Sequence, residues 1–260
     1  MEQWDSATGY ELYVGRWSRA ISVEFVNWLQ PRSNLKWLEI GCGTGALTQA
    51  IAENCSPSYL LAIDKSKVYI EQARRSNNLN CISFFNKDIN SFKVTDDFDN
   101  ITSGLVLNFI PDIATILKKL LKKLKSGGQL SAFVWDYAGH YQPMRFFWDA
   151  AKEVTPGAEL FDPGKKFANC TENGLIGLLQ ELNLEDIQFS SIDKIATFNN
   201  FDDYWLPIAA AQGSVSEFIN LLTPDEIAEV KQSIKRKLPI AANGQIKMVI
   251  SSLAVKAQKR

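Results

Sequence analysis

A glycine-rich turn between an apolar segment and a helical pattern constrains the fold of this chain more than any other feature. Residues 38–45 read LEIGCGTG, and the run 46–52 behind them is typical of a helix. Glycine permits positive φ and lets the backbone approach a ligand without an intervening Cβ. A glycine turn between a strand and a helix N-terminus is where α/β proteins hold nucleotide-like ligands. We therefore predict a ligand site at this turn.

The turn alone leaves the ligand open. Gly41-x-Gly43-x-x-Ala46 also matches the fingerprint of dinucleotide-binding proteins in its G-x-G-x-x-G/A form. A nicotinamide dinucleotide and a methyl-donor nucleoside both fit such a turn, so the flanking residues and the rest of the chain must distinguish them.

Apolar strand patterns alternate with helical patterns from residue 35 onward. The predicted strands are 36–40, 59–63, 81–85, 100–107 and 129–135. This alternation predicts a parallel sheet covered on both faces, with ligands bound outside the carboxyl ends of its strands. The candidate residues at those ends are Gly41 to Gly45, Asp64, Asp88, Asn108 and Asp136.

Beyond residue 136 the regular alternation breaks, and helical insertions precede two late strands. The strand-like segments are 184–198 and 244–258. Ser66, Thr171 and Thr223 are expected to cap helices that begin directly after them, because their hydroxyls accept bonds from free backbone N–H groups. The predicted helices are 67–75, 171–182, 201–212, 215–222 and 224–237.

The composition is ordinary for a globular protein and excludes several function classes. The 260 residues carry a net charge of −1, which gives no electrostatic signature of nucleic-acid binding. The lysine-rich run 118–125 interleaves with an apolar stripe at helical spacing, so we interpret it as a solvated helix face rather than a membrane surface. The four cysteines and single histidine lack zinc-like or disulfide spacing. With no signal-peptide pattern at the N-terminus, we expect a cytoplasmic protein.

The motifs together resemble those of the class I S-adenosylmethionine-dependent methyltransferases, in particular small-molecule members with a ubiquinone-biosynthesis-like core. The residues that carry the resemblance lie within 34–136: the run 38–45, Asp64, 87–89, 107–112 and 124–128. The resemblance implies an α/β, Rossmann-like sheet of seven mostly parallel strands, with helices on both faces, an antiparallel last strand and a helical cap. It also implies S-adenosyl-L-methionine as the methyl donor and S-adenosyl-L-homocysteine as the product.

The resemblance assigns roles to individual residues. Asp64 would hold the ribose, and Asp88 with the backbone of Ile89 would bind adenine. Glu39 would lie near the methionine end, where its carboxylate attracts an ammonium group but would repel a pyrophosphate. Gly41, Cys42, Gly43 and Gly45 would form the donor loop. The remaining candidate donor contacts are Lys65, Asn108, Tyr13, Arg16 and Trp17.

The flanking segments would surround the acceptor. Within a single methyltransferase domain spanning 1–260, the resemblance implies N-terminal lid helices in 1–30, a cofactor-binding core in 34–136, and cap or substrate insertions in 137–183 and 199–243. Aromatic residues in these segments fit either pocket walls or plain core. His140, the only histidine, is the candidate general base. Asp136 and Asn108 supply too few oxygen ligands for a convincing metal site, so no metal is expected.

Several alternatives remain at the level of sequence. An NAD-dependent oxidoreductase has no support beyond the fingerprint, since no Tyr-x-x-x-Lys pair is present. A non-catalytic protein of the same fold would bind S-adenosylmethionine without turnover. The motif after residue 107 lacks the Pro-Pro-aromatic pattern of nucleobase amino-methyltransferases, which favours a small-molecule acceptor over nucleic acid. Whether O, N or C is methylated, and whether the protein is a monomer or a homodimer, stays open.

Overall fold

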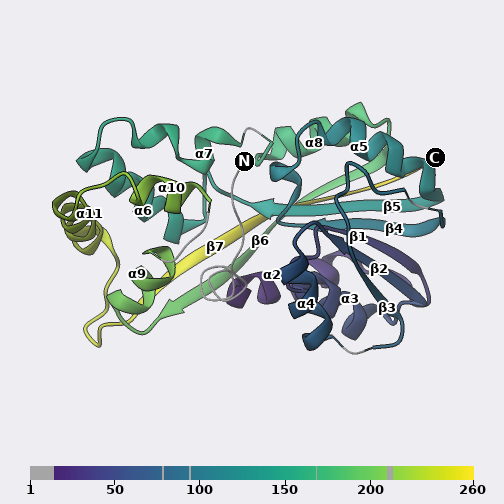
Figure 1. Ribbon diagram of the computed structural model, residues 1–260, viewed down its shortest axis with the longest axis horizontal. Helices are drawn as coiled ribbons and strands as arrows, with labels where there is room; N and C mark the ends of the chain where they lie inside the picture. Colours follow the sequence, from purple (N-terminus) through teal and green to yellow (C-terminus); the bar gives the residue numbers. More distant parts are fainter. Residues whose placement is uncertain (1–14, 78, 94, 168, 210–212) are drawn as a thin grey trace.

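The computed structural model describes residues 15–77, 79–93, 95–167, 169–209 and 213–260, and a seven-stranded sheet is its central element (Figure 1). The strand order is β3-β2-β1-β4-β5-β7-β6. β1 to β5 are parallel, and β7 is antiparallel to both β5 and β6. The predicted Rossmann-like fold with an antiparallel last strand is confirmed. The strands are β1 (Lys36–Ile40), β2 (Tyr59–Asp64), β3 (Ile82–Asn86), β4 (Phe98–Gly104), β5 (Leu124–Trp135), β6 (Glu185–Phe198) and β7 (Ile246–Gln258).

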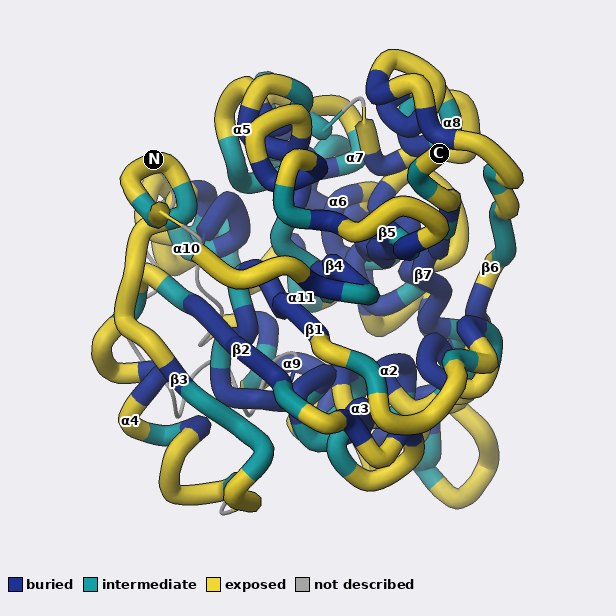
Figure 2. Tube along the Cα trace, turned by 90° about the vertical axis from the view of Figure 1, so that its right-hand side faces the viewer, coloured by how far each residue is buried: buried dark blue, intermediate teal, exposed yellow. Residues whose placement is uncertain are grey.

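Helices cover both faces of the sheet, as an all-parallel core requires. In Figure 1, α2 (Arg16–Leu29), α3 (Ala46–Cys55) and α4 (Lys67–Ser76) lie below the sheet, and α5 (Ile113–Leu120) and α8 (Glu172–Glu181) lie above it. The strands in the middle of the sheet are buried along most of their length (Figure 2). Within the described ranges, no helix combines the length and apolarity needed to cross a membrane.

Three predicted helix caps are confirmed. The Ser66 hydroxyl accepts a hydrogen bond from the backbone N–H of Tyr69, and the Thr171 hydroxyl accepts one from Gly174. Thr223 forms a capping box with Glu226, in which each side chain accepts from the other residue's backbone N–H. These short polar side chains fix where α4, α8 and α11 (Pro224–Lys237) begin.

The predicted strand 100–107 is wrong at its carboxyl end. β4 stops at Gly104 because Leu105 adopts a φ of +62°, and a single 3-10 turn (Leu107–Phe109) follows. The predicted start of the fifth strand at residue 129 is also late. β5 begins at Leu124, and Gly127 (φ +71°) lies within it beside a register shift against β4. Positive φ values of this kind leave no mark on hydrophobic periodicity.

A helical cap packs on the far part of the β6–β7 hairpin. Residues 246–251 of β7 extend beyond β5, which ends opposite Ser252, and they pair with β6. Around this extension Figure 1 shows the cap at the left of the molecule. The helical cap that the fold prediction includes is therefore present. Its helices are α6 (Gln142–Val154), α7 (Pro163–Lys166), α9 (Phe201–Ala209), α10 (Ser214–Ile219) and α11, with a 3-10 turn at Ala158–Leu160.

Buried aromatic side chains form the centre of the cap. Phe147 and Trp148 have no solvent exposure, and both rings contact Phe218 of α10. These residues are therefore packed core. They belong to the same apolar cluster as the side chains of the sheet.

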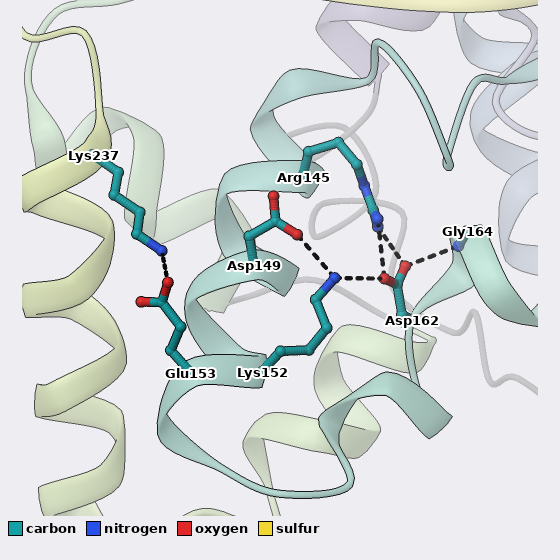
Figure 3. Close-up of polar contacts among 7 residues, drawn as sticks. All are labelled: Arg145, Asp149, Lys152, Glu153, Asp162, Gly164 and Lys237. Carbon is teal, nitrogen blue, oxygen red and sulfur yellow. Dashed lines mark hydrogen bonds and ion pairs between the residues drawn. The ribbon is translucent and has the colours of Figure 1, made fainter.

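An ion-pair network fastens the loop before α7 onto α6 (Figure 3). Asp162 has no solvent exposure, and its carboxylate accepts from two guanidinium nitrogens of Arg145 and from the backbone N–H of Gly164. Lys152 bridges the carboxylates of Asp149 and Asp162. Nearby, Glu153 of α6 accepts from Lys237 of α11. These ion pairs thus connect α6 to the loop before α7 and to α11.

The burial of Asp162 yields a stability prediction. Asp162→Asn leaves the Arg145 guanidinium without its counter-charge, so it should lower the free energy of unfolding by about 3 kcal/mol, the usual cost of breaking a buried pair. Asp149→Asn is the matched control. Asp149 pairs with Lys152, as Asp162 does, but at an exposed position, so this substitution should lower the free energy of unfolding by under about 1 kcal/mol. Urea unfolding followed by tryptophan fluorescence compares the two. Equal midpoints would show that the buried pair does not stabilise the cap.

Candidate active site

The glycine loop between β1 and α3 has the backbone geometry that the sequence predicts. Gly41, Gly43 and Gly45 have φ values of +68°, +53° and +93°. The N–H groups of Gly41 and Cys42 both donate to the carbonyl of Ile63, at 2.8 and 3.0 Å, which holds the loop against the end of β2. The loop thus turns sharply at the carboxyl edge of the sheet and exposes backbone there.

Neighbouring side chains also require glycine at two of these positions. A Cβ on Gly41 would lie 2.5 Å from a methyl group of Val106, in the segment after β4. A Cβ on Gly45 would lie 2.6 Å from the side-chain amide of Asn77. Gly45 leads directly into α3, whose first turn points backbone N–H groups at the loop. The partial positive charge of this helix end favours electron-rich ligand groups.

Cys42 lies inside the loop as a neutral thiol. Its side chain is buried, and burial raises the pKa of the thiol well above its usual value, with the carboxyls of Glu39 and Asp64 adding to the effect. A thiol of this kind lines a site but does not act as a nucleophile.

Glu39 is a buried acid at the base of the loop. Its carboxyl is 1% exposed and accepts a 2.6 Å hydrogen bond from the hydroxyl of Thr48 on α3. Burial raises the pKa of Glu39 to about 8; the bond from Thr48 opposes this shift, and the charge of Asp64 adds to it. The carboxyl is therefore largely protonated at neutral pH and ready to ionise beside a cation. Thr48 was not among the predicted residues, although it lies one helical turn behind the glycine loop.

Asp64 links the glycine loop to the start of α4. One carboxylate oxygen accepts from the backbone N–H of Gly43 at 2.9 Å, and the other accepts from that of Ser66 at 2.8 Å. Burial raises the pKa of Asp64, while these two bonds lower it. Lys65, the next predicted contact, is exposed, and its carbonyl accepts from the side chain of Asn86. The carboxylate of Asp64 is thus fixed beside the loop, with lone pairs left for a ligand.

Asp88 and Ile89 lie next to Asp64 at the end of β3. The backbone N–H of Lys87 donates to the carbonyl of Asp64, which brings the two strand ends together. The Asp88 carboxylate is exposed and accepts from the backbone and side chain of Asn90, as in a turn. Ile89 is partly buried against the main core. The adenine contact stays a prediction for Asp88 and Ile89.

Asn108 carries an unsatisfied amide at the end of β4. Both its Oδ1 and its Nδ2 are buried, and neither has a hydrogen-bond partner in the described part of the chain. Buried polar groups nearly always have a partner, so an orphaned amide indicates a place where a ligand or water binds. Val106, two residues before Asn108, lies against the loop, since its methyl groups occupy the place that a Cβ on Gly41 would need. Asn108 therefore lies where both the donor loop and the β4 end meet.

His140 lies in a solvated loop after β5. Its side chain is 74% exposed, with Nδ1 3.4 Å from a carboxylate oxygen of Asp136. Asp136 also accepts from the backbone N–H groups of Gly139 and His140, so it closes this loop. The role of general base stays a prediction for His140. Among the residues that the structure describes, no group of three or more His, Cys, Asp or Glu side chains is placed to hold a metal ion.

Two predicted donor contacts lie at the cap instead of the glycine loop. The Arg16 guanidinium donates to Asp203 of α9 at 3.2 Å and stacks on the rings of Trp17 and Phe198. Trp17 in turn packs edge-on against Phe198 of β6. Tyr13 lies outside the described residues. The structure therefore groups the loop, Glu39, Asp64, Asp88 and Asn108 at one sheet edge, with Arg16 and Trp17 against the cap.

Comparison with known proteins finds methyltransferases. Residues 38–128 match the family model of a methyltransferase domain. The chain is 24% identical over 241 residues to malonyl-[acyl-carrier protein] O-methyltransferase of Acetivibrio thermocellus, covering 89% of this chain and 82% of that protein. It is 30% identical to the protein of that name from Priestia megaterium, over 52% of this chain and 49% of the relative, so that match spans only half of each.

Solved structures share the fold. The plantazolicin methyltransferase BpumL in complex with S-adenosylhomocysteine superimposes with a TM-score of 0.55 at 18% identity, over 98% of this chain and 89% of BpumL. The matched family model begins inside β1 and ends within β5, so it contains the loop, Asp64, Asp88 and Asn108. Residues 38–128 thus match a methyltransferase domain, and the whole chain shares the sheet order and fold of solved methyltransferases.

Proposed function

We propose that this protein transfers the methyl group of S-adenosyl-L-methionine to a small-molecule acceptor by in-line displacement. The observation that carries the proposal is the juxtaposition of a buried acid, Glu39, with the loop-bound carboxylate of Asp64 around the three glycines. Two acids at this edge suit a ligand with a cationic end and a ribose.

The donor would lie along the carboxyl ends of β1, β2 and β3. Asp64 would accept hydrogen bonds from the ribose hydroxyls and would still accept the one from the backbone N–H of Gly43. Asp88 and the backbone of Ile89 would bind the adenine. Glu39 would ionise next to the ammonium of the methionine portion. Because the sulfonium is itself the electrophile, the protein mainly has to align donor and acceptor and exclude water.

The acceptor would approach from the cap. The division into a core of 34–136 and cap segments of 137–183 and 199–243 stays a prediction, and within 137–183 helix α8 covers the sheet and does not join the cap. An aromatic wall supports this side of the site. The ring of Phe109, next to Asn108, packs on Phe167, which packs on Tyr137 after β5. The named relatives methylate a malonyl thioester carrier and plantazolicin, so related enzymes take chemically different acceptors. We extend to this chain only the small-molecule class.

Two further expectations stay proposals. The four cysteines are free thiols, which supports a reducing compartment such as the cytoplasm. A monomer and a homodimer are both compatible with the fold.

The role of Asp64 predicts a loss of donor affinity. Asp64→Asn keeps the shape of the side chain but turns one acceptor oxygen into a donor, so it should weaken S-adenosylhomocysteine binding by about tenfold or more, since a charge-assisted hydrogen bond is lost. Asp97→Asn, at an exposed position, is the control and should bind as the wild type does. Isothermal titration calorimetry measures both. Unchanged affinity in folded Asp64→Asn would contradict the proposed donor site.

The raised pKa of Glu39 predicts proton release on binding. Glu39 holds its proton below pH 8, and the ligand ammonium stabilises the carboxylate, so S-adenosylhomocysteine should expel nearly one proton at pH 7 and bind more weakly as the pH falls below 8. Titrations in buffers of different ionisation enthalpy measure the number of protons.

Two comparisons isolate the effect of Glu39. 5′-Methylthioadenosine lacks the ammonium and should release fewer protons, although it retains the ribose. Glu39→Gln should release correspondingly fewer protons when it binds S-adenosylhomocysteine. Equal proton release for both ligands in the wild type would refute a contact between Glu39 and the methionine end.

A further inference from the structure

Arg16 is held in a fixed orientation at the junction of α2 and the cap. Its Nη1 donates to a carboxylate oxygen of Asp203, whose other oxygen accepts from the backbone N–H of Asn199. The guanidinium carbon lies 4.4 Å from the centre of the Trp17 ring and 4.9 Å from that of Phe198. Two rings and one ion pair therefore fix both the plane and the rotation of the guanidinium.

The opposite edge of the same guanidinium is unsatisfied. Nε and Nη2 are both buried, and neither has a hydrogen-bond partner within the described ranges. These two nitrogens form one side of the guanidinium fork and point their N–H groups in parallel, which is the arrangement that binds both oxygens of a carboxylate. Leaving two charged donors buried without acceptors is costly, so an acceptor is expected at this edge.

A small cavity adjoins Arg16 on the cap side. Its lining is mostly apolar and aromatic, and the described residues that form it belong to α2, the loop at the start of α6, β6 and α9; the glycine loop, Asp64 and Asp88 contribute none of them. The enclosed space is ≈10 Å³, about that of one water molecule, so only the tip of a ligand would enter it. The other lining residues are Trp17, Tyr141, Pro143, Phe198, Tyr204, Pro207 and Ile208.

We propose that the free Nε–Nη2 edge of Arg16 binds a terminal carboxylate of the methyl acceptor, so that the protein acts on an apolar or aromatic carboxylic acid. This inference rests on the proposed methyl transfer and adds the chemical class of its substrate. The contact of Arg16 with the donor's carboxylate stays a prediction, and the experiment below distinguishes the two roles.

The surroundings favour an anion with an apolar body. Asp203 uses only Nη1, so the guanidinium retains two donors for a second carboxylate. Outside the one-water space, the aromatic and proline residues beside it would contact the carbon atoms next to the carboxylate. Arginine suits this role better than lysine would, because its planar fork pairs with a carboxylate through two parallel bonds.

The test compares an acid with its amide on protein saturated with S-adenosylhomocysteine. The probes are 3-phenylpropionate and 3-phenylpropionamide, which differ in charge but hardly in shape, with binding measured by calorimetry. The wild type should bind the acid about tenfold or more tightly than the amide, as expected for a bidentate charged pair. Arg16→Gln should lower the affinity for the acid to that for the amide and leave the affinity for S-adenosylhomocysteine unchanged. Arg16→Lys keeps the charge but not the paired N–H donors, so its affinity for the acid should lie between those of the wild type and Arg16→Gln.

Arg32→Gln is the control, because Arg32 is an exposed arginine beyond the end of α2. Equal binding of acid and amide by the wild type would overturn the proposal. So would a tenfold loss of S-adenosylhomocysteine affinity in Arg16→Gln and Arg16→Lys, since this result would assign the edge to the donor. Failure of S-adenosylhomocysteine to bind the wild type at all would instead refute the proposed methyl transfer, which separates the two claims.

Discussion

The carboxylate of Asp64 connects the glycine loop to the start of α4, and the proposed donor site depends on this connection. It accepts one hydrogen bond from the glycine loop after β1 and another from the backbone at the start of α4. The loop is thereby fixed in a conformation with three positive φ values, against the carbonyl of Ile63. Because parallel strands end at the same edge, this anchoring also sets the distance of the loop from the ends of β3 and β4.

Burial of acidic groups at this edge gives the site its chemical character. Burial of Glu39 inside the sheet raises the pKa of its carboxyl to about 8, although Thr48 donates hydrogen bonds that lower it. A buried carboxyl of this kind costs stability that a cationic ligand end can recover by stabilising the ionised form. The site therefore suits a ligand with a cationic end, such as the ammonium of the proposed methyl donor.

Much of this organisation could be predicted from local sequence. The strand 36–40, the caps at Ser66, Thr171 and Thr223, and the helix 224–237 follow from periodicity and short-range hydrogen bonds, which depend on neighbours in the chain. The carboxyl end of β4 and the start of β5 could not be predicted, because the positive φ values of Leu105 and Gly127 do not alter the hydrophobic pattern. The location of Arg16 depends on Asp203, 187 residues further along, and no local pattern encodes such a contact. The orphaned amide of Asn108 likewise becomes visible only when burial is known.

The central claim is that the sheet edge around Glu39, Asp64 and Asn108 binds the methyl donor. A crystal structure of the protein with S-adenosylhomocysteine tests it most directly. The account predicts ribose hydroxyls within hydrogen-bond distance of Asp64, the amino group near Glu39 and the adenine beside Asp88 and Ile89. A ligand bound at any other place, or bound here with its amino-acid end away from Glu39, would contradict it.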